Sequence, residues 1–210
     1  MLNCTIKSEY IADPPVKVAL MYEAVSALVR ENVAIDRLKV QDITSRAGIG
    51  KGTAYEYFAS KEEIIAHALM YEYSCKIREL VDSVKAVNDF RSRIYRVMDW
   101  IYENREYNQM FTRLMQLLAV AGGSPLTGGD DPFAREATQF ILTVVGEIME
   151  DGFKEGVFTE KDPIKRAIVV LTQMSQYGCI VMSPYSQFGI KMSDEELREF
   201  VYSTTVKALN

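Results

Sequence analysis

The spacing of apolar residues along this 210-residue chain predicts helices almost throughout. The clearest early case lies over residues 16–31, where apolar residues recur every three or four positions and so share one helix face. That face is made of Val18, Met21, Tyr22, Val25, Leu28 and Val29. No segment sustains the two-residue alternation that is typical of a half-buried strand. The chain is therefore predicted to be all-α.

Capping residues mark where the later helices begin. Ser60 precedes acidic residues, Asp89 precedes an apolar face, Asp162 is followed by proline, and Ser193 with Glu196 forms a capping box. The predicted helices are 60–80 or longer, 89–105, 107–121, 133–155, 163–183 and 194–209. Residues 1–15 are expected to be a flexible arm. The glycine-rich residues 121–132 are expected to form a surface loop, because they lack the Gly-Lys-Ser/Thr ending of a phosphate-binding loop.

Residues 38–61 form the most informative stretch of the chain. Val40, Ile43 and Ala47 share one face of a short helix, and Gly48 follows where a chain that turns favours a residue tolerant of positive φ. A second short helix is predicted from Lys51 to Phe58. Two such helices around a tight turn are a helix-turn-helix, whose second helix enters the DNA major groove.

The same stretch carries a family resemblance. The run Ala47-Gly48-Ile49-Gly50-Lys51-Gly52-Thr53-Ala54-Tyr55-Glu56-Tyr57-Phe58, followed by Ser60-Lys61-Glu62-Glu63, resembles the signature of the tetracycline-repressor (TetR) family of bacterial transcription regulators. The resemblance covers about 50 residues, from Val16 to His67. Lys39 stands where the family usually has Thr, and Gly50 where Ser is usual. Both departures weaken a helix cap, by roughly 1 kcal/mol or less each.

The resemblance implies an organisation and a function. It implies an N-terminal helix-turn-helix domain at 16–61 and a C-terminal effector-binding and dimerisation domain at 62–210, after the arm at 1–15. A homodimer would place two recognition helices in successive major grooves, about 34–36 Å apart, on a near-palindromic operator in double-stranded DNA. A small hydrophobic effector would release the protein from its operator, and repression is the family's default. The alternative is a ligand-independent DNA-binding protein that acts architecturally or through a protein partner.

The expected DNA contacts follow from residue type and from the resemblance. Lys51 and Thr53 lie near the start of the second helix and can reach base edges, while Gly52 allows the backbone to approach a phosphate. Tyrosine hydroxyls and a lysine ammonium can donate to phosphates. The expected DNA-binding residues are Gln41, Lys51, Gly52, Thr53, Tyr55, Tyr57 and Lys61. Phe58 is expected to face the core.

The C-terminal part is rich in Met and aromatic residues at helical spacing. Such stripes are usually core, but Met is also an adaptable lining for apolar ligands, and pockets between bundle helices are common. The candidate effector-binding residues are Tyr95, Met98, Trp100, Tyr102, Phe111, Met115, Phe140, Val144, Met174 and Tyr177. Residues 167–182 are apolar nearly all round, so one face could serve a partner. The candidate dimer-interface residues are Val169, Val170, Gln173, Phe200, Val201 and Thr204.

Charge and composition narrow the alternatives. The net charge is −5, yet residues 1–61 carry 8 basic and 7 acidic residues, so any DNA-binding surface is a local patch on an acidic protein. Three dispersed cysteines and no signal-peptide pattern indicate a soluble cytoplasmic protein. His67 is the sole histidine and lacks ligand or catalytic partners at defined spacing, so a structural role is favoured. Neither a catalytic constellation nor a metal or cofactor site is expected, and the chain is predicted not to be an enzyme.

Overall fold

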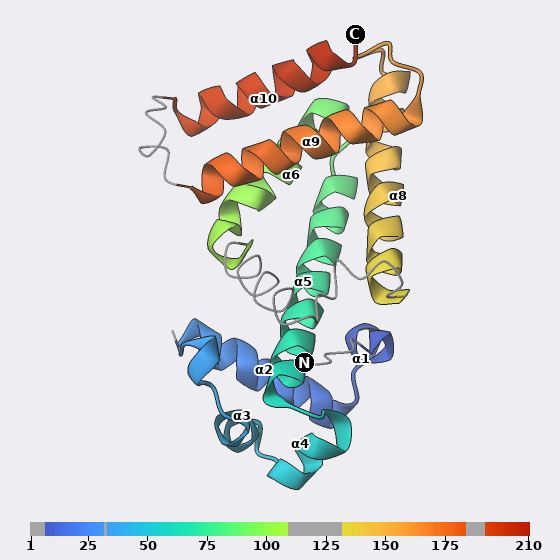
Figure 1. The fold of residues 1–210 in the computed structure, drawn as a ribbon. Helices are drawn as coiled ribbons and strands as arrows, with labels where there is room; N and C mark the ends of the chain where they lie inside the picture. Colours follow the sequence, from blue (N-terminus) through green and yellow to red (C-terminus); the bar gives the residue numbers. More distant parts are fainter. Residues whose placement is uncertain (1–6, 32, 109–131, 184–191) are drawn as a thin grey trace. The chain divides into compact units, whose positions relative to one another are not determined.

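The computed structural model describes residues 7–31, 33–108, 132–183 and 192–210, and within these ranges the regular elements are all helical (Figure 1). The prediction of an all-α fold is confirmed. The helices are α1 (Ser8–Ala12), α2 (Val16–Arg30), the 3-10 helix η1 (Ile35–Arg37), α3 (Val40–Ala47), α4 (Lys51–Tyr57), α5 (Lys61–Lys85), α6 (Phe90–Glu103), α8 (Pro132–Lys154), α9 (Pro163–Met182) and α10 (Asp194–Ala208). The helix predicted at 107–121 and the loop predicted at 121–132 fall almost wholly outside the described residues.

The described chain divides into two compact units. Of the described residues, unit 1 contains those up to Arg78 and residues 132–136, and unit 2 contains residues 79–108 and those from Ala137 onward, so the division falls inside α5 and near the start of α8. The domain boundary predicted after residue 61 stays a prediction.

The N-terminal arm differs from its prediction. Residues 8–12 form the helix α1, where the sequence predicted a flexible segment. Ile11 is buried in this short helix, and Tyr10 packs edge-on against Phe58 with the ring centres 5.7 Å apart. Contacts with distant residues therefore order a segment that has little helical pattern of its own.

Unit 1 is built around the apolar face predicted for residues 16–31. Val18, Met21 and Val25 on α2 are fully buried, together with Ile43 on α3 and Ile64 on α5. Phe58, at the end of α4, is buried as predicted and lies against the rings of Tyr22 and His67. The core thus holds α3 and α4 against α2 and the first turns of α5.

Unit 2 has its own core, to which α6, α8, α9 and α10 all contribute. In Figure 1, α9 and α10 run side by side, and α6 packs against both. The largest fully buried side chains of this unit are Phe90, Ile94, Phe158 and Tyr177. Asp162 accepts hydrogen bonds from Ile164 N and Lys165 N at the start of α9, and Ser193 forms its predicted capping box with Glu196.

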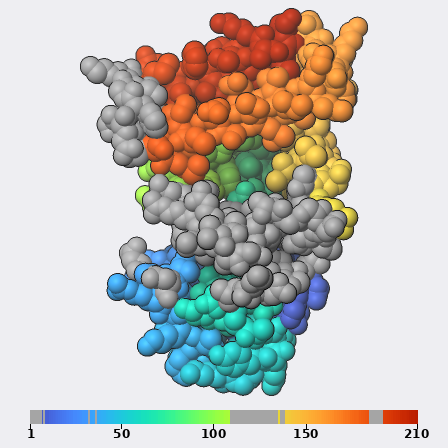
Figure 2. Space-filling model, in the orientation of Figure 1, coloured from blue at the N-terminus to red at the C-terminus, as the bar shows by residue number. Residues whose placement is uncertain are grey.

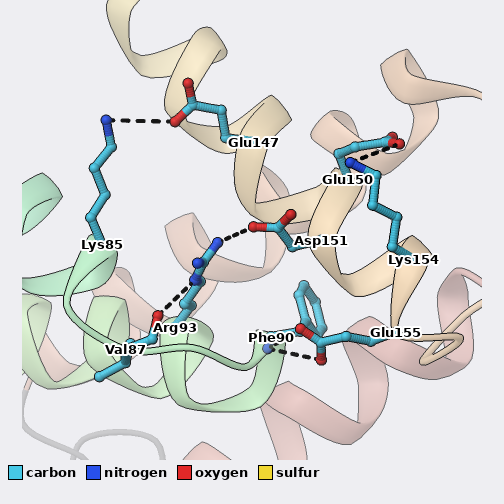
Figure 3. A network of polar contacts seen from close by, with 9 residues as sticks. All are labelled: Lys85, Val87, Phe90, Arg93, Glu147, Glu150, Asp151, Lys154 and Glu155. Carbon is cyan, nitrogen blue, oxygen red and sulfur yellow. Dashed lines mark hydrogen bonds and ion pairs between the residues drawn. The ribbon is translucent and has the colours of Figure 1, made fainter.

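A polar network joins α8 to the corner between α5 and α6 (Figure 3). Arg93 forms an ion pair with Asp151 and donates to the carbonyl of Val87. The carboxylate of Glu155 accepts the N–H of Phe90, one of the donors that a helix start leaves without an intrahelical partner. Lys85 adds an outer ion pair with Glu147 at 3.7 Å.

None of the described helices combines the length and the apolar composition that a membrane span requires.

Candidate nucleic-acid interface

The turn between α3 and α4 is fixed by its backbone. Gly48 adopts a left-handed conformation with φ of 68°, which non-glycine residues rarely do. The N–H of Ile49 donates to Thr44 O at 3.0 Å, and the N–H of Gly48 donates to Ser45 O at 3.3 Å. This pair of bonds is a Schellman motif, which satisfies carbonyls that the end of α3 would leave free.

The start of α3 is stabilised despite the missing threonine. The carboxylate of Asp42 accepts the backbone N–H of Lys39 at 2.9 Å. An acidic residue three positions after the cap supplies half of a capping box and suits the positive end of the helix dipole. Lys39-x-x-Asp42 is a signal that the sequence contains, so the weakening expected at this cap is partly offset.

The seven-residue helix α4 has one buried and one exposed side. Ala54 and Phe58 are buried, four residues apart on one line of the helix. At about 100° per residue, Gly52 and Glu56 lie on the opposite line. Lys51, Gly52 and Glu56 are exposed, and Tyr55 is 55% exposed. In the space-filling view, α3 and α4 lie next to each other on the surface of unit 1 (Figure 2).

Two residues, Gly52 and Glu56, lie on the outer line of α4. A Cβ added to Gly52 would meet no atom within 4 Å, so packing inside the protein does not explain this glycine. Glu56 was not among the predicted contact residues, although it lies on the same line and makes no hydrogen bond or ion pair with any described residue. The four-residue spacing from Gly52 is the signal that could have identified Glu56.

Three of the other predicted DNA contacts have structural partners within the protein, and Thr53 is half-buried on α4. Lys61 donates its ammonium to Leu38 O at 3.0 Å and lies 3.8 Å from a carboxylate oxygen of Glu62. Tyr57 is half-buried, and its ring packs edge-on against Tyr10. Gln41 is exposed on α3 and donates to Ser45 Oγ at 2.8 Å. The side chains of Lys61, Tyr57 and Gln41 therefore have a structural role within the protein in addition to the predicted contact with DNA.

Comparison with known proteins agrees with this geometry. The family model described as "Bacterial regulatory proteins, tetR family" matches residues 32–68, which contain η1, α3, α4 and the start of α5. The HTH-type transcriptional regulator YhgD of Bacillus subtilis (strain 168) is 28% identical over 132 residues, which are 61% of this chain and 65% of that relative. The segment that carries the helix-turn-helix therefore matches the tetR family of regulatory proteins. The alignment spans just under two thirds of the curated relative's length.

The whole fold of this chain is also similar to solved structures. A TetR/AcrR family regulator from Thermobifida fusca YX-ER1 superposes with a TM-score of 0.63, at 14% identity, covering 93% of this chain and 100% of that one. FadR from Bacillus subtilis, in complex with stearoyl-CoA, superposes with a TM-score of 0.52, at 17% identity, covering 91% and 97%. At such low identity the likeness shows a shared fold.

The described candidate effector residues lie on three helices of unit 2, namely α6, α8 and α9. Met98 and Tyr177 are fully buried in its core, and Trp100, Tyr102, Val144 and Met174 are half-buried. Phe140 is exposed on α8 beside exposed Ile141 and Leu142. The Tyr95 hydroxyl donates to Glu199 on α10, and burial raises its pKa. Phe111 and Met115 lie outside the described residues, and the whole effector set stays a prediction.

The candidate dimer residues divide by exposure. Val170 and Val201 are buried in the core of unit 2, while Val169, Gln173 and Thr204 are half-buried, and the dimer set stays a prediction. Phe200 is 57% exposed on α10. Ile164 and Ile168 on α9 were not among the predicted interface residues, yet they are 69% and 59% exposed.

Among the described residues, no group of three or more His, Cys, Asp or Glu side chains is placed to hold a metal ion.

Proposed function

We propose that this chain is a sequence-specific DNA-binding transcriptional regulator, a repressor that a small hydrophobic effector releases from its operator. The observation that carries the DNA-binding part is the helix-turn-helix itself. Its second helix presents Lys51, Gly52 and Tyr55 to solvent, whereas Ala54 on the same helix is buried. An exposed helix of this kind fits the major groove, where lysine can donate to guanine O6 and N7.

Lys51→Ala tests the groove assignment. A selected operator is first obtained from random double-stranded DNA with the wild-type protein. Loss of a base contact should then relax discrimination at one base pair per half-site, by about 1–3 kcal/mol. Lys61→Ala is a poorer test than Lys51→Ala, because its ammonium also donates to Leu38 O. If Lys51→Ala leaves every base preference unchanged, α4 does not read the groove through this side chain.

The dimer proposal now rests on exposed apolar residues of unit 2. Ile164 and Ile168 lie four residues apart on α9, so they share one face of that helix. Phe200 supplies a third exposed apolar side chain on α10, which packs beside α9. Large apolar side chains exposed together on neighbouring helices are typical of interaction surfaces. We therefore place the symmetric interface on this α9–α10 surface, with half-buried Val169, Gln173 and Thr204 at its edge.

The effector proposal rests on the apolar character of unit 2 and on the fold. FadR, which shares the fold, is described in complex with stearoyl-CoA, and this supports testing fatty acids and acyl-CoA thioesters first. Phe140, Ile141 and Leu142 form a run of exposed apolar residues on α8. Their exposure suits contact with an apolar ligand chain.

Two measurements test the effector. Candidate ligands are screened for a rise in melting temperature, and each ligand that raises it is added to the protein–operator complex. A releasing effector must bind the DNA-free state more tightly, so operator affinity should fall as its concentration rises. Fluorescence of Trp100, the only tryptophan, should also change if the ligand binds near α6. If no stabilising ligand changes operator affinity, the ligand-independent alternative is favoured.

A further inference from the structure

Lys7 makes an unusual set of contacts inside unit 1. Its ammonium donates to the carbonyl of Tyr57, the last residue of the recognition helix α4, at 2.7 Å. The same nitrogen lies 5.0 Å from the ring centre of Tyr10 and 5.9 Å from that of Phe58. A cation at the carbonyl end of a helix interacts favourably with the helix dipole, and aromatic faces attract it further.

The backbone of Lys7 is held as firmly as its side chain. Its N–H donates to Nε2 of His67 at 2.9 Å, and Nδ1 of His67 lies 2.8 Å from the carbonyl of Glu63. Nδ1 therefore carries the proton and Nε2 accepts, which is a neutral imidazole. His67 is fully buried on α5, so this acceptor has a fixed position.

We propose that Lys7 is a positioning residue for DNA binding, which ties the end of the recognition helix to α5. The inference rests on the proposed function, since it concerns how α4 is presented to DNA. A helix of seven residues has little stability alone, so its orientation depends on contacts at its two ends. The glycine turn holds the first end, and Phe58 together with Lys7 holds the second. Lys7 acts there through Tyr57 O and need not touch DNA.

Lys7→Met and Lys7→Arg test this role in the full chain. Met retains an unbranched stem over the rings but cannot donate, so operator affinity should fall about tenfold, in line with a lost charged hydrogen bond. Arg can still donate to Tyr57 O and should restore most of the affinity. The slope of log affinity against log salt should stay unchanged in Lys7→Met, because a lost phosphate contact would reduce it by nearly one.

Lys17→Met is the matched control. Lys17 is an exposed lysine of α2 in the same unit and makes no hydrogen bond or ion pair with the described residues. Equal losses of affinity in the two Met variants, or a reduced salt slope in Lys7→Met, would show a charge effect and overturn the proposal. Undiminished affinity in Lys7→Met would overturn it too. Failure of the wild type to select any DNA would instead reject the proposed function.

A pH profile adds a second readout. Burial lowers the pKa of His67 below its ordinary value of 6.5, against the opposing influence of Glu63 and Glu9, while the Lys7 ammonium lowers it further. Protonated His67 cannot accept the N–H of Lys7, so operator affinity should decline as pH falls below about 6.5. His67→Gln keeps a neutral side chain and should remove this part of the decline. Identical profiles for wild type and His67→Gln would contradict the role given to this contact.

Discussion

Glu56 introduces a negative charge on the outer line of the recognition helix. A carboxylate repels phosphates, which weakens binding to all DNA, but it can accept a hydrogen bond from cytosine N4 in the major groove. The two effects act on different quantities: the first on overall affinity, the second on base preference. An exposed acidic side chain with no hydrogen-bond or ion-pair partner among the described residues is therefore suited to selectivity more than to strength of binding.

Glu56→Gln should raise affinity for unrelated DNA and weaken the preference for a C·G pair at one position of each half-site. Gln favours adenine, so the preferred base pair should shift. The measurement is a binding-site selection with both proteins at one salt concentration. Glu23→Gln, at an exposed position on α2, removes the same charge and serves as the control. An unchanged base preference beside a general gain in affinity would reduce Glu56 to a purely repulsive role.

At the scale of single residues, the sequence correctly predicted a side chain's environment where it depends on residues nearby in the chain. Phe58 is buried, as its place in the helix-turn-helix predicted. The contact between Lys7 and His67 could not be foreseen, because the two residues are 60 positions apart and no sequence pattern links them. Single-residue roles that depend on long-range contacts need the structure.

At the scale of elements, the junction of α6 and α8 is packed without spare volume. A Cβ at Gly152 on α8 would lie 2.5 Å from the Phe90 ring and 2.8 Å from the Phe158 ring. These two rings pack edge-to-face in the core, and the Glu155 carboxylate next to them holds the N–H of Phe90 (Figure 3). The position therefore requires glycine for steric reasons.

Gly152→Ala should lower the free energy of unfolding by about 1–3 kcal/mol, the usual cost of overpacking a core. The matched control is Gly146→Ala on the same helix, where a Cβ would meet nothing within 4 Å. There alanine should raise the free energy of unfolding by up to about 1 kcal/mol, through helix propensity alone. Chemical denaturation measures both changes. Equal effects of the two variants would refute the steric explanation.

Most described helices begin and end within one or two residues of their predicted bounds, because caps and apolar periodicity are local properties. Asp89, Asp162 and Ser193 all accept the backbone hydrogen bonds that their positions predicted. Helix α1 was missed because its order comes from Tyr10 and Ile11 packing on distant residues.

At the scale of the whole molecule, the proposed assembly depends on which face of α9 is exposed. The sequence showed only that this helix is apolar nearly all round, so it could not assign Val169 and Val170 to the core or to a partner. The structure separates them from Ile164 and Ile168, which point to solvent. Burial within a fold is a three-dimensional property that periodicity alone leaves ambiguous when every face is apolar.

Ile168→Asp should convert the proposed dimer to monomers, because it places a charge inside an apolar interface. Sedimentation at micromolar concentration checks the mass. Ala86→Asp, at an exposed position just after α5, makes the same kind of change outside α9 and α10 and should leave the mass unaltered. A wild-type protein that sediments as a monomer would remove the dimer, and a dimeric Ile168→Asp would move the interface elsewhere.

The exposed side of α4 affects how the DNA preference of such a protein can evolve. The side chains of Lys51 and Glu56 make no hydrogen bond or ion pair with the described residues, and Gly52 has no side chain, whereas Ala54 and Phe58 are buried. Mutation at the three outer positions is thus nearly neutral for folding, and selection can act on it through DNA preference alone. Gene duplication followed by drift at these positions would yield regulators with new operators while the scaffold stays intact. A randomised library restricted to these codons should therefore be rich in folded proteins that bind different DNA sequences.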